Sequence, residues 1–306
     1  MPRWLVWAIS VVGFALIGRW TMNSALAVLG HELHYPDWFE SSRQYLEMGI
    51  ATAILAAIAY YEGPRKIGLV GGLSLNVRQT LHGIFVVLGL GQMAYGIFFL
   101  ILVGAARRGI LPANSFVFGV PNEPPDVVMH IWWSVHAGWV EEIIVIGLVF
   151  FLLKRVPWHI GGTPLWMTGW ATAITITIRV SYHTYHGLMV IPMMLTGWLF
   201  VRLYRTTGTI IPVIIVHVVW DVLDLIAHTP WQRAVFIAIV YGLSELVTKG
   251  TGEFAALGFP HFPYSDDRWR GVYWAQWRWE KTPAFFPSKS QGKRMREHVG
   301  IRTVDD

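Results

Sequence analysis

Long runs of apolar residues, separated by short polar stretches, are the main pattern along this chain. Each run approaches the roughly 20 residues that an α-helix needs to cross the hydrocarbon core of a bilayer. We therefore expect an all-α protein, a polytopic bundle of transmembrane helices followed by a polar C-terminal tail. About eight spans are predicted, at residues 4–29, 44–61, 80–105, 127–153, 164–188, 190–204, 209–228 and 232–248.

Three details qualify this pattern. Arg19 interrupts the first span, and Gly187 and Pro192 separate the fifth and sixth spans, which are otherwise almost continuous. A sharp turn or a re-entrant segment is expected there. The first run resembles a signal peptide, but no small-x-small cleavage site follows it, so we expect it to stay as an uncleaved span.

The composition agrees with a membrane protein. Hydrophobic residues make up 54% of the chain and charged residues 14%, whereas about a quarter of the residues of a soluble domain are charged. Many of the 17 tryptophans lie near the ends of the apolar runs, as amphipathic rings do at a headgroup boundary. The absence of cysteine excludes disulfides and thiolate chemistry.

Lysine and arginine predict the orientation, because cytoplasmic loops carry more of them. With the N-terminus inside, the predicted inner loops hold Arg65, Lys66, Arg78, Lys154, Arg155, Arg202 and Arg205. The predicted outer loops hold Arg19, Arg43, Arg107, Arg108 and Arg233. This bias favours a multi-pass protein of the cell membrane with both termini in the cytoplasm. The net charge of +5 then belongs to inner loops and a basic tail, with lipid and not nucleic acid as its partner.

Four regions follow from these patterns. Residues 1–126 are N-terminal transmembrane helices, 127–228 a catalytic helical core, 229–248 the last transmembrane helix and 249–306 a cytoplasmic tail. The tail is basic and rich in tryptophan, which favours a segment that lies on the surface of an anionic membrane.

Ionisable side chains inside the predicted spans indicate a functional site, because each costs a few kcal/mol in lipid. The fourth span holds the adjacent pair Glu141 and Glu142 near its middle. Neighbours on an α-helix point about 100° apart, so one carboxylate can face a cavity while the other meets a neighbouring helix. A pair that only locks the packing of helices is the structural alternative.

Two further spans carry histidines beside other charges. Arg179 and His183 are four residues apart and are expected to share a helix face, with His186 three residues further on. His217 and Asp221 have the same four-residue spacing, and Asp224 and His228 would extend their face. We expect the three charged spans to surround one water-accessible cavity, with Glu141 within about one water of His183.

The order of these motifs resembles the CPBP (Abi) intramembrane proteases, which include the type II CAAX prenyl endopeptidases. The resemblance covers residues 127–228 and rests on Glu141-Glu142, on Tyr182-His183-Thr184-Tyr185-His186-Gly187 and on His217-x-x-x-Asp221. It implies an intramembrane endopeptidase that acts on a membrane protein or peptide.

The resemblance also implies a role for each residue. Glu141 would be the general base that activates water, with His183 assisting it. His217 and Asp221 would polarise the scissile carbonyl and hold the oxyanion, with Asp221 where many members have Asn. Glu142, Arg179 and His186 would support these four.

Two positions depart from the family pattern. The Arg of Glu-Glu-x-x-x-Arg is Ile146 here, and the Phe of Phe-x-x-x-His is Arg179. We expect Arg179 to replace the missing cation and to contact Glu142, because opposite charges in a site of low dielectric stabilise each other.

No cofactor is required by this chemistry, since a glutamate can activate water without a metal. Zinc is left open, and its ligands would be His183, His217 and Glu141. Two other function classes are kept: a catalytically altered membrane scaffold or bacteriocin-immunity-type protein on the same fold, and a proton-coupled transporter that uses these charges as a relay.

Overall fold

The computed structural model describes residues 1–31, 37–64, 77–112, 114, 127–160, 163–226, 232, 235–240 and 242–243. Residues 1–247 form one compact unit. The predicted tail, His228 and part of the eighth span lie outside the described residues, so the predictions for them stand as they were. The four-region division is likewise still a prediction.

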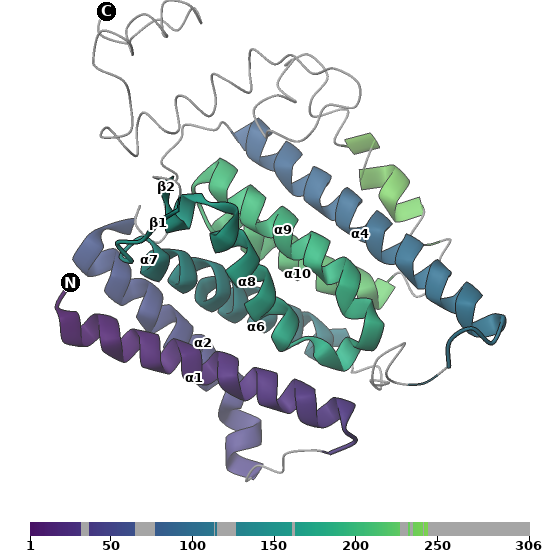
Figure 1. Ribbon diagram of the computed structural model, residues 1–306, viewed down its shortest axis with the longest axis horizontal. Coiled ribbons are helices and arrows are strands. Elements are labelled where there is room, and N and C mark those ends of the chain that lie inside the picture. The colour runs from purple at the N-terminus through teal and green to yellow at the C-terminus, as the bar shows by residue number, and fades with distance from the viewer. Residues whose placement is uncertain are drawn as a thin grey trace, which may run out of the picture. The chain divides into compact units, whose positions relative to one another are not determined.

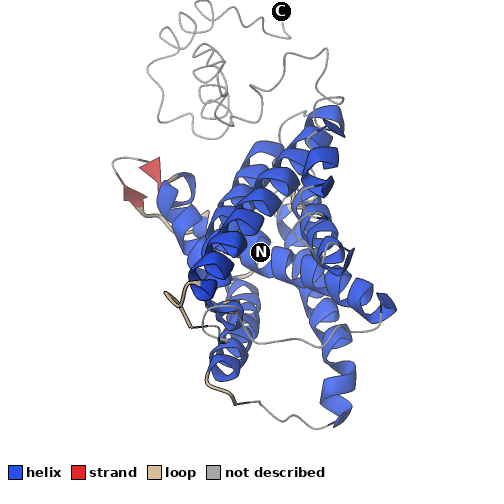
Figure 2. Cartoon of the chain, turned by 90° about the vertical axis from the view of Figure 1, so that its right-hand side faces the viewer, coloured by secondary structure: helices blue, strands red, loops and turns tan. Residues whose placement is uncertain are grey.

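Helices dominate the described part of the chain, which confirms the helical character of the predicted fold (Figure 2). The long helices are α1 (Arg3–Val28), α2 (Asp37–Glu62), α4 (Val77–Arg107), α6 (Val127–Glu141), α8 (Gly169–Ser181), α9 (Val190–Thr207) and α10 (Ile211–Ile226). The short elements are η1 (Glu142–Leu148), α7 (Val149–Leu153), η2 (Leu165–Met167), η3 (Thr184–Met189), β1 (His159–Ile160) and β2 (Thr163–Pro164), the two strands being antiparallel.

Four described helices are long and apolar enough to cross a membrane: Arg3–Val28, Gly83–Arg107, Val127–Leu153 and Thr184–Arg205. Ile211–Leu223 is a shorter apolar helix. The chain is therefore a multi-pass membrane protein, although four spans and one shorter helix are fewer than the eight predicted. The prediction at 44–61 falls within α2, which has the right length but is not among the four.

The helices that carry the charged motifs pack on one another. α6 packs extensively on α10, and α9 packs on both α4 and α8 (Figure 1). Gly138 allows the close approach of α6 and α10, because a side chain there would collide with Val218 and with the main chain of α10. This contact brings the Glu141 region beside His217.

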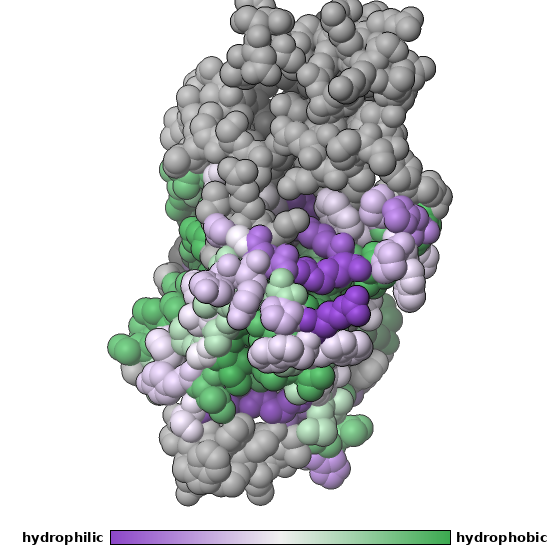
Figure 3. Space-filling model, turned by 90° about the vertical axis from the view of Figure 1, so that its left-hand side faces the viewer, coloured by the Kyte–Doolittle hydropathy of each residue, from purple (hydrophilic) through white to green (hydrophobic). Residues whose placement is uncertain are grey.

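Two sets of contacts define the ends of the bundle. At the end called here the N-terminal end, the Glu62 carboxylate accepts from the Met1 ammonium at 2.8 Å and pairs with Arg155 Nη2 at 2.6 Å. At the opposite end, called the η3 end, Ser24 Oγ contacts Thr184 Oγ1 at 2.8 Å and accepts from the main-chain N–H of Tyr185 at 2.9 Å. Figure 3, viewed from the side on which the N-terminus lies in Figure 1, shows hydrophilic side chains gathered in a patch bordered by hydrophobic ones.

The sharp turn predicted near Gly187 is confirmed. Gly187 has φ 61° and ψ −140° inside η3, a conformation that glycine adopts without the steric cost of a Cβ. The chain reverses there, so that Arg205 near the end of α9 donates to the carbonyl oxygens of Trp166 and Thr168 just before α8. α8 and α9 are consequently antiparallel neighbours.

Two local predictions were wrong, and one local feature was not predicted. The unpredicted feature is the π-helix of residues 142–148, which begins directly after Glu141. α8 ends at Ser181, so His183 lies in the turn after the helix and does not continue the face of Arg179. Arg19 neither interrupts α1 nor lies in a loop, because it forms an ion pair with the buried Glu47 of α2.

Candidate active site

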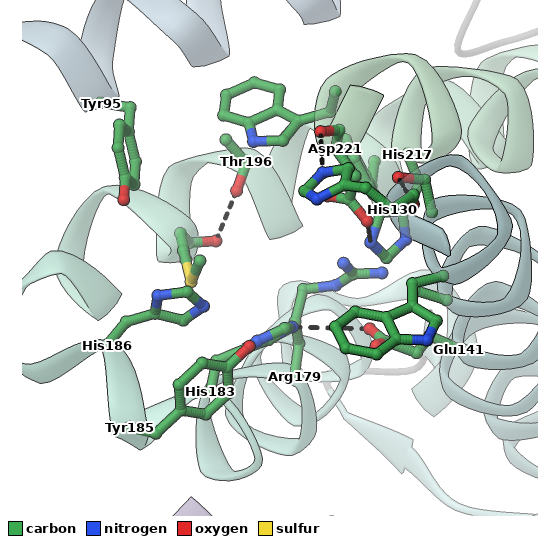
Figure 4. Close-up of a pocket in the computed structure, with 16 residues that line it drawn as sticks. Tyr95, His130, Glu141, Arg179, His183, Tyr185, His186, Thr196, His217 and Asp221 are labelled. Carbon is green, nitrogen blue, oxygen red and sulfur yellow. Dashed lines mark hydrogen bonds and ion pairs between the residues drawn. The ribbon is translucent and has the colours of Figure 1, made fainter. Parts of the chain in front are cut away.

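A cavity of about 320 Å³ lies among the helices that carry the charged motifs (Figure 4). Its walls come from α4, α6, α8, η3, α9 and α10. The lining residues are Tyr95, His130, Trp133, Ser134, Ala137, Glu141, Arg179, His183, Tyr185, His186, Met193, Thr196, Phe200, His217, Trp220 and Asp221. Six of the seven predicted site residues are in this set, and the seventh, Glu142, lies directly behind it.

The Glu141 carboxylate is held from the α8–η3 turn. Its Oε2 atom accepts a hydrogen bond from the Tyr182 hydroxyl at 2.8 Å and lies 3.5 Å from His183 Nε2. This confirms the predicted proximity of Glu141 and His183. Tyr182 is itself buried, with its ring 5.5 Å from that of Trp20 on α1.

The Glu142 carboxylate is fully buried at the start of η1 and has two cationic or polar partners. Its Oε1 atom forms an ion pair with Arg179 and lies 2.6 Å from His217 Nδ1. The predicted contact between Arg179 and Glu142 is therefore confirmed. A buried carboxylate without such partners would be expensive, because desolvation removes its interactions with water.

The His217 ring lies between the carboxylates of Glu142 and Asp221. Its Nδ1 atom faces Glu142, and its Nε2 atom lies 3.5 Å from Asp221 Oδ2 one turn further along α10. His130 of α6 donates from Nε2 to the main-chain carbonyl of Asp221 at 3.0 Å. Figure 4 shows these groups around the upper part of the cavity and Glu141, Arg179 and His183 below them.

His186 lies on a third side of the cavity. Its ring centroid is 5.6 Å from that of His183 and 4.1 Å from that of Tyr185. His186 therefore lines the cavity together with His183 and Tyr185. The structure thus brings the charged motifs of all three predicted spans to one cavity.

The chemistry of these donors bears on a metal. Within the described residues, no three His, Asp or Glu side chains gather closely enough to hold one ion. His217 turns its Nδ1 to Glu142, whereas His183 contacts Glu141. The zinc set of His183, His217 and Glu141 stays a prediction.

Two groups of functional interest were missed by sequence reasoning. The sequence assigned Tyr182 no role beyond its place in a motif. Tyr182 contacts Glu141 from the position directly after Ser181, where α8 ends. The second group centres on the Glu47 carboxylate, which forms an ion pair with Arg19. Its Oε2 atom lies 3.1 Å from His136 Nε2. The available signal was an ionisable residue inside each of three apolar runs, the first, second and fourth predicted spans.

Comparison with known families matches residues 123–223, about a third of the chain, to the family described as type II CAAX prenyl endopeptidase Rce1-like. The predicted CPBP resemblance is confirmed for this segment. Neither a curated protein nor a solved structure matches the chain. At the level of the family, the Rce1-like match indicates a membrane protease of the CAAX protease type.

Tyr182 and His183, which contact Glu141, and Arg179 and His217, which contact Glu142, all lie within the Rce1-like segment. Ile146, at the position of the family's arginine, is fully buried in η1. Arg179 enters from the neighbouring helix, with its Cζ atom 4.8 Å from the centre of the Phe200 ring. A cation from another helix thus stands beside the second glutamate.

Proposed function

We propose that this chain is an intramembrane endopeptidase in which Glu141 activates a water molecule for attack on a peptide bond. The observation that carries the proposal is the placement of Glu141. One of its oxygens is held by Tyr182 and lies beside His183, while the side chain also lines the cavity. A general base needs this combination of a fixed carboxylate and access to a water and a substrate.

The proposed reaction gives each group one position and a defined role. Glu141 accepts a proton as the water oxygen bonds to the scissile carbonyl carbon, and His183 orients the carboxylate and the water. The oxyanion is stabilised by the Nε2–H group of His217, whose ring Glu142 holds through Nδ1 and Asp221 orients. Glu141 then returns the proton to the leaving amide nitrogen as the carbon–nitrogen bond breaks.

Arg179 and Glu142 have a positioning role in this proposal. Their ion pair joins α8 to η1, and Glu142 in turn fixes His217 through Nδ1. Through these contacts Glu142 links the α6–η1 span, which carries Glu141, to α10, which carries His217. The scaffold alternative has weaker support, because a cation still neutralises Glu142 although the family's arginine is absent.

The same proposal includes the membrane context. The N-terminal end of the bundle is assigned to the cytoplasm, since Arg155, Lys154 and Arg205 lie there. The substrate is a membrane protein or peptide, and no cofactor is required. Dialysis against a chelator, followed by addition of zinc, tests the last point.

The decisive experiment compares the wild type with Glu141→Gln, which keeps the shape and removes the base. Both are purified, placed in lipid nanodiscs and incubated with a library of membrane-inserted peptides, with cleavage read by mass spectrometry. We expect cleavage by the wild type to fall by about 10²- to 10⁴-fold in the variant, the usual contribution of a general base. Arg108→Gln, at an exposed position, is the control. Equal cleavage by wild type and Glu141→Gln would support a scaffold or contaminant activity instead.

A further inference from the structure

Helix α1 lies outside the Rce1-like segment of residues 123–223, yet it packs on the elements that carry the site. It contacts η3, η1 and α8. Gly13 allows the approach to η1, because a side chain at this position would collide with the buried Leu148. None of the residues that line the described cavity comes from α1. Any effect of α1 on the reaction must therefore act through the side chains that it holds.

One face of α1 is directed at the turn between α8 and η3. Thr21 and Ser24 are three residues apart, so they share this face of the helix. Thr21 Oγ1 lies 3.0 Å from the hydroxyl oxygen of Ser181, the last residue of α8. The Ser181 hydroxyl donates to the carbonyl oxygen of Ile178 at 2.8 Å. Its single proton is thus in use, and Thr21 is the donor in the contact between the two hydroxyls.

Ser24 caps the start of η3 from a different helix. The first N–H groups of a helical segment have no partner within it. His183 is the N-cap residue of η3, but its side chain makes no capping hydrogen bond and lies beside Glu141 instead. The buried Ser24 Oγ accepts from the main-chain N–H of Tyr185 at 2.9 Å and lies 2.8 Å from Thr184 Oγ1. α1 thereby supplies the cap that His183 does not.

The residues that α1 holds lie on both sides of the pair that contacts Glu141. Ser181 directly precedes Tyr182 and His183, and the residues bonded to Ser24 directly follow them. The Trp20 ring of α1 also packs on the Tyr182 ring, with 5.5 Å between their centroids. The segment that holds the Glu141 carboxylate is therefore attached to α1 before, at and after its two functional residues.

From these contacts we infer that α1 sets the position of the turn that carries His183, with Thr21 and Ser24 as positioning residues for the reaction. The inference deepens the proposed function and rests on it, because the turn holds the proposed base. Loss of either hydroxyl frees the turn to move, so that Glu141 loses its alignment with the water. Substrate binding is retained, since α1 does not line the cavity.

The variants Thr21→Val and Ser24→Ala test the two contacts. Valine has the shape of threonine without the hydroxyl, and Thr21→Ser keeps the hydroxyl as the rescue variant. Ser10→Ala is the control, because the Ser10 hydroxyl donates to the Val6 carbonyl oxygen within α1. Each full-length protein is placed in lipid nanodiscs, and hydrogen–deuterium exchange of peptides that contain Tyr185 is followed by mass spectrometry. Cleavage of one peptide that the wild type cuts gives kcat and KM at equal amounts of folded protein.

In Ser24→Ala, exchange at the Tyr185 amide should become faster, because this N–H loses its acceptor. We expect kcat to fall by about 10-fold in Ser24→Ala and in Thr21→Val, with KM close to that of the wild type, since misalignment of a base affects the chemical step. Thr21→Ser should recover most of the lost kcat, and Ser10→Ala should match the wild type in exchange and in kcat.

Unchanged exchange in Ser24→Ala would overturn the inference that α1 holds the turn. Faster exchange with an unchanged kcat would overturn the positioning role, and so would a rise in KM alone. If the wild type cleaves no peptide, the proposed function fails and the positioning role fails with it. The exchange data would still decide whether α1 holds the turn, so the two failures can be told apart.

Discussion

Arg179 reaches from α8 to an ion pair with Glu142, a carboxylate with no exposed surface at the first residue of the η1 π-helix. The two residues are far apart in sequence, yet they are in direct contact in the described structure. Ile146 stands at the position where the family pattern has an arginine four residues after the second glutamate, so Arg179 supplies a cation from another helix. Several predictions depend on it and on its neighbours.

Replacing Arg179 with leucine should destabilise the protein and abolish activity. The reason is that Glu142 would stay buried without its cation, and breaking a buried pair typically costs about 3–5 kcal/mol. Thermal unfolding in detergent micelles measures the loss, with Arg108→Leu as the exposed control. The double variant Arg179→Leu/Glu142→Leu should recover much of the stability but not the activity. An unchanged melting temperature for Arg179→Leu would rule out a structural role for the pair.

Tyr182→Phe tests the hydrogen bond that holds Glu141. The ring still packs on Trp20, so the variant should fold, with a melting temperature lowered only by the loss of this hydrogen bond. A hydrogen bond to a charged group contributes about 1.5–3 kcal/mol, which corresponds to a loss of roughly 10- to 100-fold in kcat. KM should stay close to that of the wild type, because the hydroxyl contacts the base and not the substrate. Tyr60→Phe, at an exposed ring, is the matched control, and a change in KM alone would contradict this role.

Asp221→Asn should keep most of the activity, whereas Asp221→Leu should lose it. The amide oxygen of asparagine can stand in for the carboxylate oxygen that lies 3.5 Å from His217 Nε2, but leucine offers no acceptor. Initial cleavage rates of the two variants, compared at equal amounts of folded protein, decide the matter. Equal losses in both would mean that the negative charge of Asp221 matters, and not its orientation of the histidine.

Acid should weaken the contact at the N-terminal end of the bundle. The pKa of Glu62 is lowered by its hydrogen bond to the Met1 ammonium and by the charge of Arg155, against a smaller opposing effect of burial. A depressed carboxyl pKa adds stability above the unfolded value, near 4.5, and that stability disappears as the pH falls through the folded value. The difference in melting temperature between wild type and Glu62→Gln should therefore be present at pH 7 and disappear as the pH falls below the unfolded value and through the lower folded pKa of Glu62. A constant difference over that range would exclude ionisation of Glu62 as its cause.

The parts of the structure that sequence predicted best are those set by length and apolar content. The spans of α1 and α4 and the combined stretch 127–153 follow from the thickness of a bilayer. The Arg179–Glu142 pair was predictable because a charge missing from one helix, at Ile146, reappeared on the next. A charged side chain inside a span has few other favourable positions, because lipid does not solvate it.

What the sequence did not show depends on contacts between distant segments. The π-helix gives no pattern among Glu142 and the six apolar or small residues that follow it, and the end of α8 at Ser181 carries no proline or glycine. Arg19 looked like a break in a span because its partner, Glu47, lies on another helix. In each case a partner far along the chain decides the conformation, and periodicity does not record it.

The π-helix also changes what surrounds the fourth span along its length. Between Val127 and Trp133 several side chains are exposed, but from Glu142 to Leu148 every residue is buried. The extra residue in the turn shifts the phase of the second half of the span relative to the first. An acyl chain packed along α6 from Val127 would thus lose contact with the span at Glu141, because neighbouring helices surround the span from there on. The glutamate pair stands at the depth where this span leaves the lipid and enters the protein interior.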